Sequence, residues 1–224
     1  MNQTIVSHSP KASFSCLDHI KSCFGCICPC FYPNVFGSQA YKALDLGPQK
    51  EDRKTLVLDL DETLVHSSVF PTNFHDFQIE VSSGGQSFTF YVHKRPDLDA
   101  FLKLVSDIYE VVIFTASLES YANPVIDLIA PWIPLTHRFF RKHCISYNGF
   151  FVKDVSRLNR PISSILICDN APISYVLNRK NGIEVKSFMG EKDDKELLSV
   201  LYPLLKKLVE VPDVTQVYLK QKSQ

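Results

Sequence analysis

Short apolar runs alternate along the chain with segments whose apolar residues recur at helical spacing. Four runs rich in β-branched residues predict buried strands, at residues 55–60, 111–114, 165–168 and 183–185. Three segments predict amphipathic helices, at residues 97–108, 118–129 and 194–209. Strands that alternate with helices form a parallel sheet covered by helices. We therefore expect an α/β fold with a doubly wound parallel sheet.

One segment departs from this alternation. Residues 76–81 and 87–93 alternate polar and apolar side chains on either side of Gly84 and Gly85, which is typical of an antiparallel hairpin. The hairpin follows the first predicted strand, within an insertion at about residues 69–94. We expect it to stand beside the main sheet.

The composition is that of a globular chain with one domain. Of 224 residues, 45% are hydrophobic and 21% are charged, which suffices for a buried core. Residues 1–52 are rich in Cys, Ser, Pro and Gly without a regular period, and we interpret them as a flexible tail and linker before a domain at 53–224. The 24 basic residues balance the 24 acidic ones, so we expect no direct binding of nucleic acid.

The cysteines concentrate near the start of the chain. Their spacing allows a zinc site, S-palmitoylation or no function for Cys23, Cys26, Cys28 and Cys30. Only Cys23 and Cys26 have the spacing of a zinc knuckle, and aromatic and aliphatic residues lie between the thiols, so we favour acylation and membrane attachment. We find no secretory signal. The prediction is an intracellular monomer, in the nucleus or cytoplasm, or associated with a membrane.

Two carboxylates end the first predicted strand. Asp59 and Asp61 follow the apolar run that begins at Thr55, and ligands of open α/β sheets bind at the carboxyl ends of strands. Side chains two residues apart in extended chain point the same way. Neighbouring carboxylates differ in pKa, so one can act as a nucleophile or metal ligand while the other donates a proton. This division favours cleavage of a phosphate ester.

Further polar residues are expected at the same edge. Thr115 follows the strand at 111–114, and Asp169 and Asn170 follow the strand at 165–168. Lys153 can add a cation. Oxygen ligands from Asp59, Asp169 and Asn170 suit Mg²⁺, whereas the five later histidines have no metal-ligand spacing. These histidines are His66, His75, His93, His137 and His143.

The segment from Asp59 to Ser67, DLDETLVHS, resembles the signature of haloacid-dehalogenase-superfamily phosphatases that act on the C-terminal domain of RNA polymerase II. The small phosphatases of that group are the most similar. Four further motifs recur in the family's order, at residues 94–96, 114–117, 147–154 and 169–172. The resemblance covers roughly residues 54–220.

The resemblance implies a Mg²⁺-dependent protein serine/threonine phosphatase that acts through an aspartyl phosphate. Asp59 would be the nucleophile and Asp61 the general acid and base. Thr115 and Lys153 would stabilise the transferring phosphoryl group, and Asp169 would support the metal site. The implied metal ligands are Asp59, the Asp61 carbonyl and Asn170.

It also implies a substrate with phosphoserine followed by proline, such as the polymerase C-terminal domain. Arg141 would bind the substrate phosphate. The implied apolar groove beside the site is lined by Val69, Val81, Phe90, Leu118 and Tyr121. Ser83 and Phe90 differ from the residues usual in this groove, which points to an altered choice of peptide.

Two other functions fit part of the pattern. A scaffold of the same fold would bind phosphopeptides without turnover. A phosphorelay receiver also joins an aspartate, a threonine and a lysine around Mg²⁺, but it needs a long-lived acyl phosphate. Asp61 argues against the receiver, because a general base there would hydrolyse that acyl phosphate.

Overall fold

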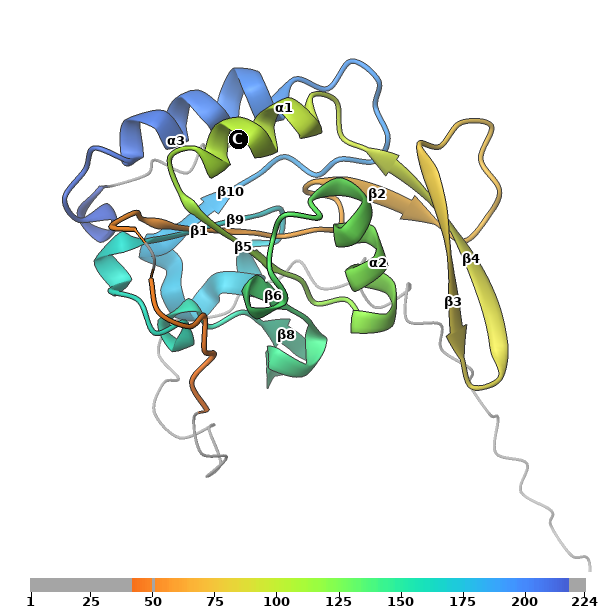
Figure 1. The fold of residues 1–224 in the computed structure, drawn as a ribbon, viewed down its shortest axis with the longest axis horizontal. Coiled ribbons are helices and arrows are strands. Elements are labelled where there is room, and N and C mark those ends of the chain that lie inside the picture. The colour runs from red at the N-terminus through yellow and green to blue at the C-terminus, as the bar shows by residue number, and fades with distance from the viewer. Residues whose placement is uncertain (1–41, 50, 218–224) are drawn as a thin grey trace, which may run out of the picture. The chain divides into compact units, whose positions relative to one another are not determined.

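The computed structural model describes residues 42–49 and 51–217. Its largest sheet has five parallel strands in the spatial order β10-β9-β1-β5-β6 (Figure 1). These strands are β1 (Thr55–Leu58), β5 (Glu110–Phe114), β6 (Arg138–Phe139), β9 (Ile165–Asp169) and β10 (Gly182–Glu184). The predicted parallel sheet is confirmed, with small differences at the strand ends and with β6 as an additional edge strand.

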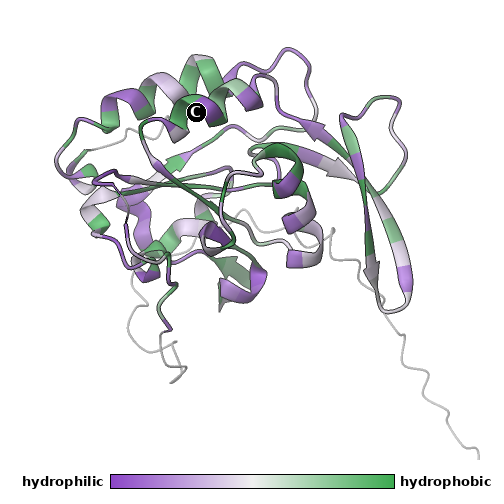
Figure 2. Ribbon diagram, viewed as in Figure 1, coloured by the Kyte–Doolittle hydropathy of each residue, from purple (hydrophilic) through white to green (hydrophobic). Residues whose placement is uncertain are grey.

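The central strand β1 separates two hydrophobic cores. Its side chains point alternately to opposite faces, and all four are buried. Leu56 and Leu58 belong to the larger core, which contains residues of the three α-helices. Those helices are α1 (Leu98–Ser106), α2 (Glu119–Ile129) and α3 (Tyr202–Leu208). Figure 1 shows α1 and α3 together over one face of the sheet, and in Figure 2 both alternate apolar and polar residues.

Residues of 3-10 helices pack on the opposite face of the sheet, where a symmetric doubly wound sheet would have α-helices. Val57 lies there in the smaller core, with Val155 and Tyr175. The last two come from 3-10 helices, η4 (Val155–Arg157) and η6 (Pro172–Asn181). Short 3-10 segments therefore do the covering that α-helices do on the first face. The other 3-10 helices within residues 42–49 and 51–217 are η2 (Leu135–His137), η3 (Arg141–His143), η5 (Ile162–Ser164) and η8 (Val214–Gln216).

The segment predicted as one helix over 194–209 is divided. A π-helical segment, η7 (Glu196–Leu201), precedes α3, and Asp194 lies outside both. The Asp194 carboxylate accepts a hydrogen bond from the Glu196 backbone N–H at 3.0 Å and also binds Arg95. Because its side chain is used in these contacts, residue 194 precedes the helix instead of continuing it.

The insertion, together with β2 directly before it, forms a three-stranded antiparallel sheet of order β2-β4-β3 that projects from the side of the main sheet (Figure 1). The predicted hairpin is confirmed as β3 (Phe77–Ser83) and β4 (Gln86–Lys94). Gly84 and Gly85 both have positive φ, at 60° and 78°, as a tight two-residue hairpin turn requires. The strand β2 (Val65–Ser68) was not predicted, because four residues with three polar side chains lack a clear strand pattern.

A second hairpin leads to Lys153. Its strands are β7 (Ile145–Tyr147) and β8 (Phe150–Val152), joined through Asn148 and Gly149. Both joining residues have positive φ, at 48° and 83°, which is the typical use of an Asn-Gly pair.

Residues 42–49 fall within the range that we assigned to the tail and linker. Leu44 and Leu46 are buried in the smaller core, and the Leu44 N–H donates to the Arg157 carbonyl at 2.7 Å. The packed part of the chain therefore extends N-terminal to Arg53. The tail over residues 1–41 lies outside the described residues.

Arg95 connects the insertion to the loop that follows β1. Its guanidinium binds Asp194 through two hydrogen bonds of 2.8 and 2.9 Å, and both side chains are almost fully buried. A third bond of 3.0 Å runs to the Thr63 carbonyl, and the Phe188 ring lies 5.4 Å from the guanidinium carbon. One buried ion pair thus holds the loop against the segment before α3.

We expect Arg95→Met to lower the free energy of unfolding by about 3–5 kcal/mol, because it leaves the Asp194 carboxylate buried without its cation. Urea denaturation followed by circular dichroism measures the change. Lys142→Ala is the control, since Lys142 and Glu119 form an exposed pair that is worth at most about 1 kcal/mol. Equal effects of the two substitutions would contradict this account of the buried pair.

Candidate active site

Three neighbouring strands end at the same edge of the main sheet. Asp59 follows β1, Thr115 follows β5, and Asp169 is the last residue of β9. Since β5 and β9 pair with opposite sides of β1, the chain changes direction at this point of the sheet. This is where open α/β sheets place their ligands.

Lys153 lies between two of these carboxylates. Its ammonium nitrogen is 2.5 Å from Asp59 Oδ1 and 2.6 Å from Asp169 Oδ2, and all three side chains are nearly inaccessible to solvent. The Lys153 backbone N–H donates to the Ser174 carbonyl at 2.6 Å, which fixes the residue at the end of the β7–β8 hairpin. A buried cation therefore joins the ends of β1 and β9.

The pKa of Asp59 depends on its burial and on two neighbouring charges, Asp169 and Lys153. Burial and the nearby Asp169 carboxylate raise the pKa of Asp59 to about 7, although Lys153 acts in the other direction. Burial between the same two carboxylates does not discharge the lysine, because their attraction raises the pKa of Lys153 above its usual value. The lysine stays cationic and offsets part of the negative charge of the two carboxylates.

Asp61 has different surroundings. Its Oδ2 accepts from the Ser117 hydroxyl at 2.6 Å and from Thr115 at 3.4 Å, and its Oδ1 accepts from the Tyr121 hydroxyl at 2.6 Å. Burial raises the pKa of Asp61, while the bonds from Ser117 and Tyr121 oppose that rise. The two carboxylates are thus distinct: Asp59 contacts a cation, and Asp61 contacts hydroxyl groups.

A tight loop holds the two aspartates. The Leu64 and Val65 N–H groups both donate to the Leu60 carbonyl, at 2.9 and 3.1 Å. Glu62 has a φ of 56°, in the left-handed region that a side chain rarely adopts, and such strain often occurs at functional loops.

Two of the predicted Mg²⁺ ligands, the side chains of Asp59 and Asn170, lie near one hydroxyl group. Thr63 Oγ1 is 3.1 Å from Asp59 Oδ2 and 3.4 Å from Asn170 Oδ1. Lys153 contacts Oδ1 of Asp59 and not Oδ2. Asp59 Oδ2 is therefore available to a second cation. Within residues 42–49 and 51–217, no three His, Cys, Asp or Glu side chains form a metal site by themselves. Asp59 and Asn170 offer oxygen atoms, the type of ligand that Mg²⁺ prefers, and the part of the Asp61 carbonyl stays a prediction.

Arg141 lies at the rim of the site. Its Nε donates to the Ala116 carbonyl at 2.6 Å, and its guanidinium carbon is 4.9 Å from the centre of the Phe151 ring. These contacts place it beside the loop after β5 that carries Thr115 and Ser117. Its role with phosphate stays a prediction.

The five residues predicted to line an apolar groove are divided between core and surface. Val81, Phe90 and Tyr121 belong to the larger core or pack against it, and the rings of Phe90 and Tyr121 are 4.9 Å apart. Val69 and Leu118 are largely exposed. The side chain of Ser83 lies outside the described part of the chain.

A family model described as NLI interacting factor-like phosphatase matches residues 54–215. The chain belongs to this family. The matched range includes all the site residues above, and it confirms the resemblance seen in the sequence. The family assignment therefore covers most of the described chain.

Two curated relatives illustrate how the NLI interacting factor-like phosphatase domain is shared. The chain is 46% identical over 167 residues to a probable C-terminal domain small phosphatase of Dictyostelium discoideum, which covers 75% of this chain and 54% of that protein. It is 44% identical over 169 residues to the carboxy-terminal domain RNA polymerase II polypeptide A small phosphatase 1 of Homo sapiens, covering 75% and 64%. The chain thus spans between about half and two thirds of each relative.

Solved structures share the fold of this chain. The fission yeast RNA polymerase II CTD phosphatase Fcp1 bound to beryllium fluoride matches with a TM-score of 0.53 and 24% identity, over 61% of this chain and 42% of that one. A second structure of Fcp1 matches with a TM-score of 0.54 over 70% and 48%. These similarities confirm the haloacid-dehalogenase-like architecture.

Sequence reasoning did not identify three hydroxyl groups of the site. Ser117 lies in the predicted motif at 114–117, and Thr63 and Ser67 lie in the one that begins at Asp59, but none was given a role. Ser117 could have been found, because it lies two residues after Thr115 at the end of a strand. Ser67 had no such signal, since it reaches the site only through Tyr121.

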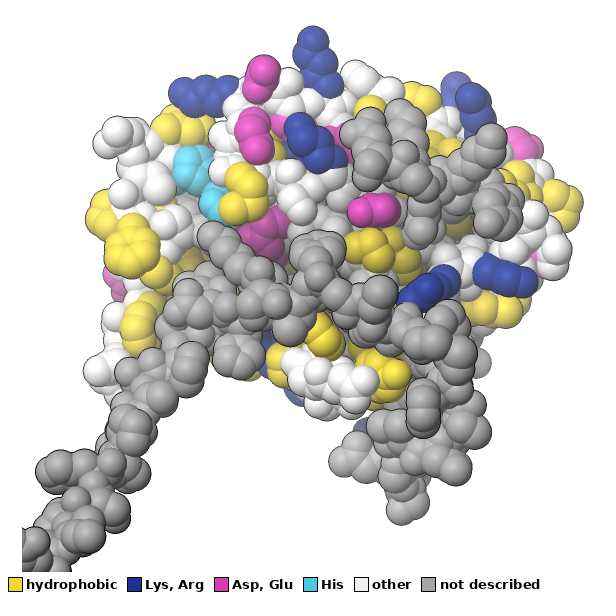
Figure 3. Space-filling model, turned by 180° about the vertical axis from the view of Figure 1, so that it is seen from behind, with side chains coloured by type: hydrophobic (Ala, Val, Ile, Leu, Met, Phe, Trp, Pro, Cys, Tyr) yellow, Lys and Arg dark blue, Asp and Glu magenta, His cyan; other side chains and the backbone are white. Residues whose placement is uncertain are grey.

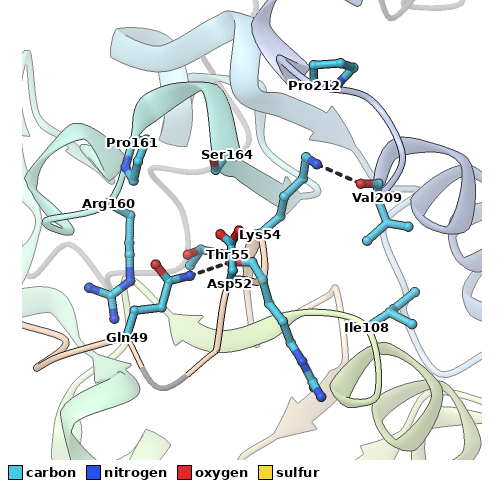
Figure 4. Close-up of a pocket in the computed structure, with 11 residues that line it drawn as sticks. Gln49, Asp52, Lys54, Thr55, Ile108, Arg160, Pro161, Ser164, Val209 and Pro212 are labelled. Carbon is cyan, nitrogen blue, oxygen red and sulfur yellow. Dashed lines mark hydrogen bonds between the residues drawn. The ribbon is translucent and has the colours of Figure 1, made fainter.

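A pocket of about 310 Å³ lies at the opposite edge of the main sheet, near the start of β1 (Figure 4). Its cations already have partners: Lys54 donates to the Val209 carbonyl at 2.7 Å, and Arg160 donates to Glu110 at 2.7 and 2.8 Å. Burial alone would raise the pKa of Glu110, but hydrogen bonds from Arg160 and Thr55 hold it below its usual value. The pocket contains no arrangement of reacting groups.

On the face seen in Figure 3, the Lys and Arg side chains of the described residues lie among acidic and apolar ones. No helix within residues 42–49 and 51–217 is long and apolar enough to cross a bilayer. Cys23, Cys26, Cys28 and Cys30 lie outside the described residues, so their acylation stays a prediction.

We expect Lys153→Met to destabilise the metal-free protein by about 3–5 kcal/mol at neutral pH, because Asp59 and Asp169 are then buried without a cation. Burial and the Asp169 carboxylate already raise the pKa of Asp59, and the substitution removes the ammonium that lowers it, so the pKa of Asp59 in the folded state lies above that in the unfolded chain. The folded state then holds more protons, and the variant loses further stability as pH rises from about 4.

Urea denaturation in chelator at several pH values measures this loss. Lys103→Met, at an exposed position of α1, is the matched control and should show a change within about 0.5 kcal/mol. A Lys153→Met protein that is as stable as the control at pH 8 would show that the ammonium is not needed between the carboxylates.

Proposed function

We propose that this chain is a Mg²⁺-dependent protein serine/threonine phosphatase that acts through an aspartyl phosphate on Asp59. The observation that carries the proposal is the different surroundings of the two carboxylates. Asp59 lies against the Lys153 ammonium, whereas Asp61 is held by hydroxyl groups. Pairs of acids in contrasting environments commonly divide the roles of nucleophile and proton carrier.

In the first step, an Asp59 carboxylate oxygen forms a bond to phosphorus while the bond from phosphorus to the seryl oxygen breaks. The proton on the Asp61 carboxyl passes to that seryl oxygen, which leaves as the free hydroxyl. Lys153 and the Thr115 hydroxyl lie where they offset negative charge on the phosphoryl oxygens.

In the second step, water attacks phosphorus and gives one proton to the Asp61 carboxylate. The bond between phosphorus and the Asp59 oxygen breaks, which releases inorganic phosphate and restores both aspartates to their starting states. The same residue therefore serves first as acid and then as base.

Asp59, Asn170 and the Asp61 carbonyl would hold Mg²⁺, with Asp169 in support. The bound cation would offset the charge of the substrate phosphate. Lys153 alone provides charge for two buried carboxylates, so a dianionic phosphate needs a further cation at this place.

We propose a phosphoserine-proline segment as the substrate, such as the C-terminal domain of RNA polymerase II. Support comes from the names of relatives that share 44–46% of aligned residues with this chain. Val81, Phe90 and Tyr121 provide apolar groups near the site, and Arg141 provides a cation at its rim. An intracellular protein that works as a monomer in the nucleus or cytoplasm fits such a substrate.

The test measures phosphate release from a phosphoserine-proline peptide and from p-nitrophenyl phosphate, each with Mg²⁺ and with chelator. Turnover of both substrates only with Mg²⁺ is expected. Turnover of p-nitrophenyl phosphate alone would retain the chemistry and reject this peptide. Binding of the phosphopeptide without any turnover would favour the scaffold.

We expect Asp59→Asn to reduce turnover of p-nitrophenyl phosphate to background, because the amide oxygen is a poor nucleophile. Asp107→Asn, at an exposed position after α1, is the control and should keep full activity. Activity of Asp59→Asn within tenfold of wild type would rule out the aspartyl phosphate.

We expect Asp61→Asn to lower kcat by roughly 10²- to 10⁴-fold through loss of the general acid and base. With p-nitrophenyl phosphate the first step needs little acid assistance, so the intermediate should accumulate. Rapid mixing should therefore show a burst of p-nitrophenol close to one equivalent of enzyme. A slow variant without a burst would argue that Asp61 does not act in the second step.

A further inference from the structure

A chain of hydrogen bonds leads from the insertion to Asp61. Ser67 Oγ in β2 lies 2.5 Å from Tyr121 Oη in α2, and Tyr121 Oη donates to Asp61 Oδ1 at 2.6 Å. On the other side, Ser117 Oγ donates to Asp61 Oδ2 at 2.6 Å. Each oxygen of the Asp61 carboxylate is therefore bound by a hydroxyl from a different element of the fold.

The direction of these bonds follows from the number of protons. A tyrosine hydroxyl has one proton, and when Asp61 is ionised that proton points to its carboxylate, which in that form only accepts. Ser67 must then donate its proton to Tyr121 Oη. Hydrogen bonds in such a series polarise one another, so the Ser67 bond strengthens the one that Tyr121 makes.

The Tyr121 hydroxyl is fixed before any substrate binds. The side chain is 7% exposed, belongs to the larger core, and packs its ring at 4.9 Å from Phe90. Asp61, in contrast, lies in a loop with the strained Glu62 next to it. The rigid core therefore determines where the carboxylate of a loop residue points.

We propose that Tyr121 is a positioning residue that holds the Asp61 carboxyl in line with the leaving oxygen, and that Ser67 acts only through Tyr121. The inference rests on the proposed role of Asp61 as general acid. A proton carrier must lie within hydrogen-bond reach of the atom it serves, and a misplacement of about 1 Å can cost roughly 10²-fold in rate. Tyr121 thus has a part in the chemistry in addition to its place beside the apolar groove.

The test compares aryl phosphates whose phenols differ in acidity. Phenyl phosphate needs a proton on its leaving oxygen, whereas p-nitrophenol leaves readily as the anion. Tyr121→Phe should lower kcat/KM by roughly 10- to 10²-fold for phenyl phosphate and by less than about threefold for p-nitrophenyl phosphate. The plot of log kcat/KM against the pKa of the leaving phenol therefore becomes steeper. Because these substrates have no peptide, a role of Tyr121 in peptide binding would not change the slope.

Ser67→Ala and the double variant Ser67→Ala/Tyr121→Phe test whether Ser67 acts on Asp61 only through Tyr121. Ser67→Ala should steepen the same plot by a smaller amount, and it should add nothing once Tyr121 is phenylalanine, since two residues that act in series are not additive. Tyr175→Phe is the matched control. It removes the same atom from a buried tyrosine whose hydroxyl has no hydrogen-bond partner among the described residues, and it should leave the slope unchanged.

Two results would overturn the inference, and they are distinguishable. If Tyr121→Phe lowers kcat/KM by the same factor for every aryl phosphate, the hydroxyl supports the structure and does not serve proton transfer. If the wild type hydrolyses none of them, the proposed phosphatase function fails, and the inference fails with it. Retained turnover of p-nitrophenyl phosphate by Tyr121→Phe shows that the variant is folded.

Discussion

The structure depends on a buried ammonium group placed between two carboxylates. Lys153 contacts Asp59 at the end of β1 and Asp169 at the end of β9, and these two neighbouring strands would otherwise end in repelling charges. A buried cation with two anions leaves one negative charge in excess, which suits a site that recruits a divalent cation together with a phosphate. The parallel pairing of the central strands and the electrostatics of the site are thus linked through one side chain.

The two aspartates of the loop after β1 have different partners. Asp59 binds the Lys153 ammonium, whereas Asp61 accepts hydrogen bonds from the hydroxyl groups of Ser117 and Tyr121. Arg95 holds the loop itself through the Thr63 carbonyl while binding Asp194. The main sheet, the insertion and the segment before α3 therefore all contact the loop that carries the Asp59 and Asp61 carboxylates.

Much of the fold was predictable because buried parallel strands are continuous apolar runs, as in β1 and β9. The sheet edge rule and the family resemblance also indicated the residues that surround Lys153. The sequence did not indicate β2, whose polar residues become a strand only through pairing with β4.

Contacts that depend on tertiary packing were equally invisible in the sequence. Tyr121 occupies an apolar helical position that is typical of core residues, and only the orientation of α2 shows that its hydroxyl reaches Asp61. The pairing of Arg95 with Asp194 joins residues 99 positions apart, and no local pattern indicates it. The same pairing keeps Asp194 outside the helical segment that begins at Glu196.

The strand order β10-β9-β1-β5-β6 has a consequence for synthesis of the protein. β1 is made first among the strands of the main sheet, yet one of its two edges pairs with β9, which emerges from the ribosome more than a hundred residues later. Until then, a fully apolar strand exposes unpaired backbone groups on that edge, which invites association with other chains. Such non-local pairing slows folding, so the completion of the sheet waits until β9 has been made.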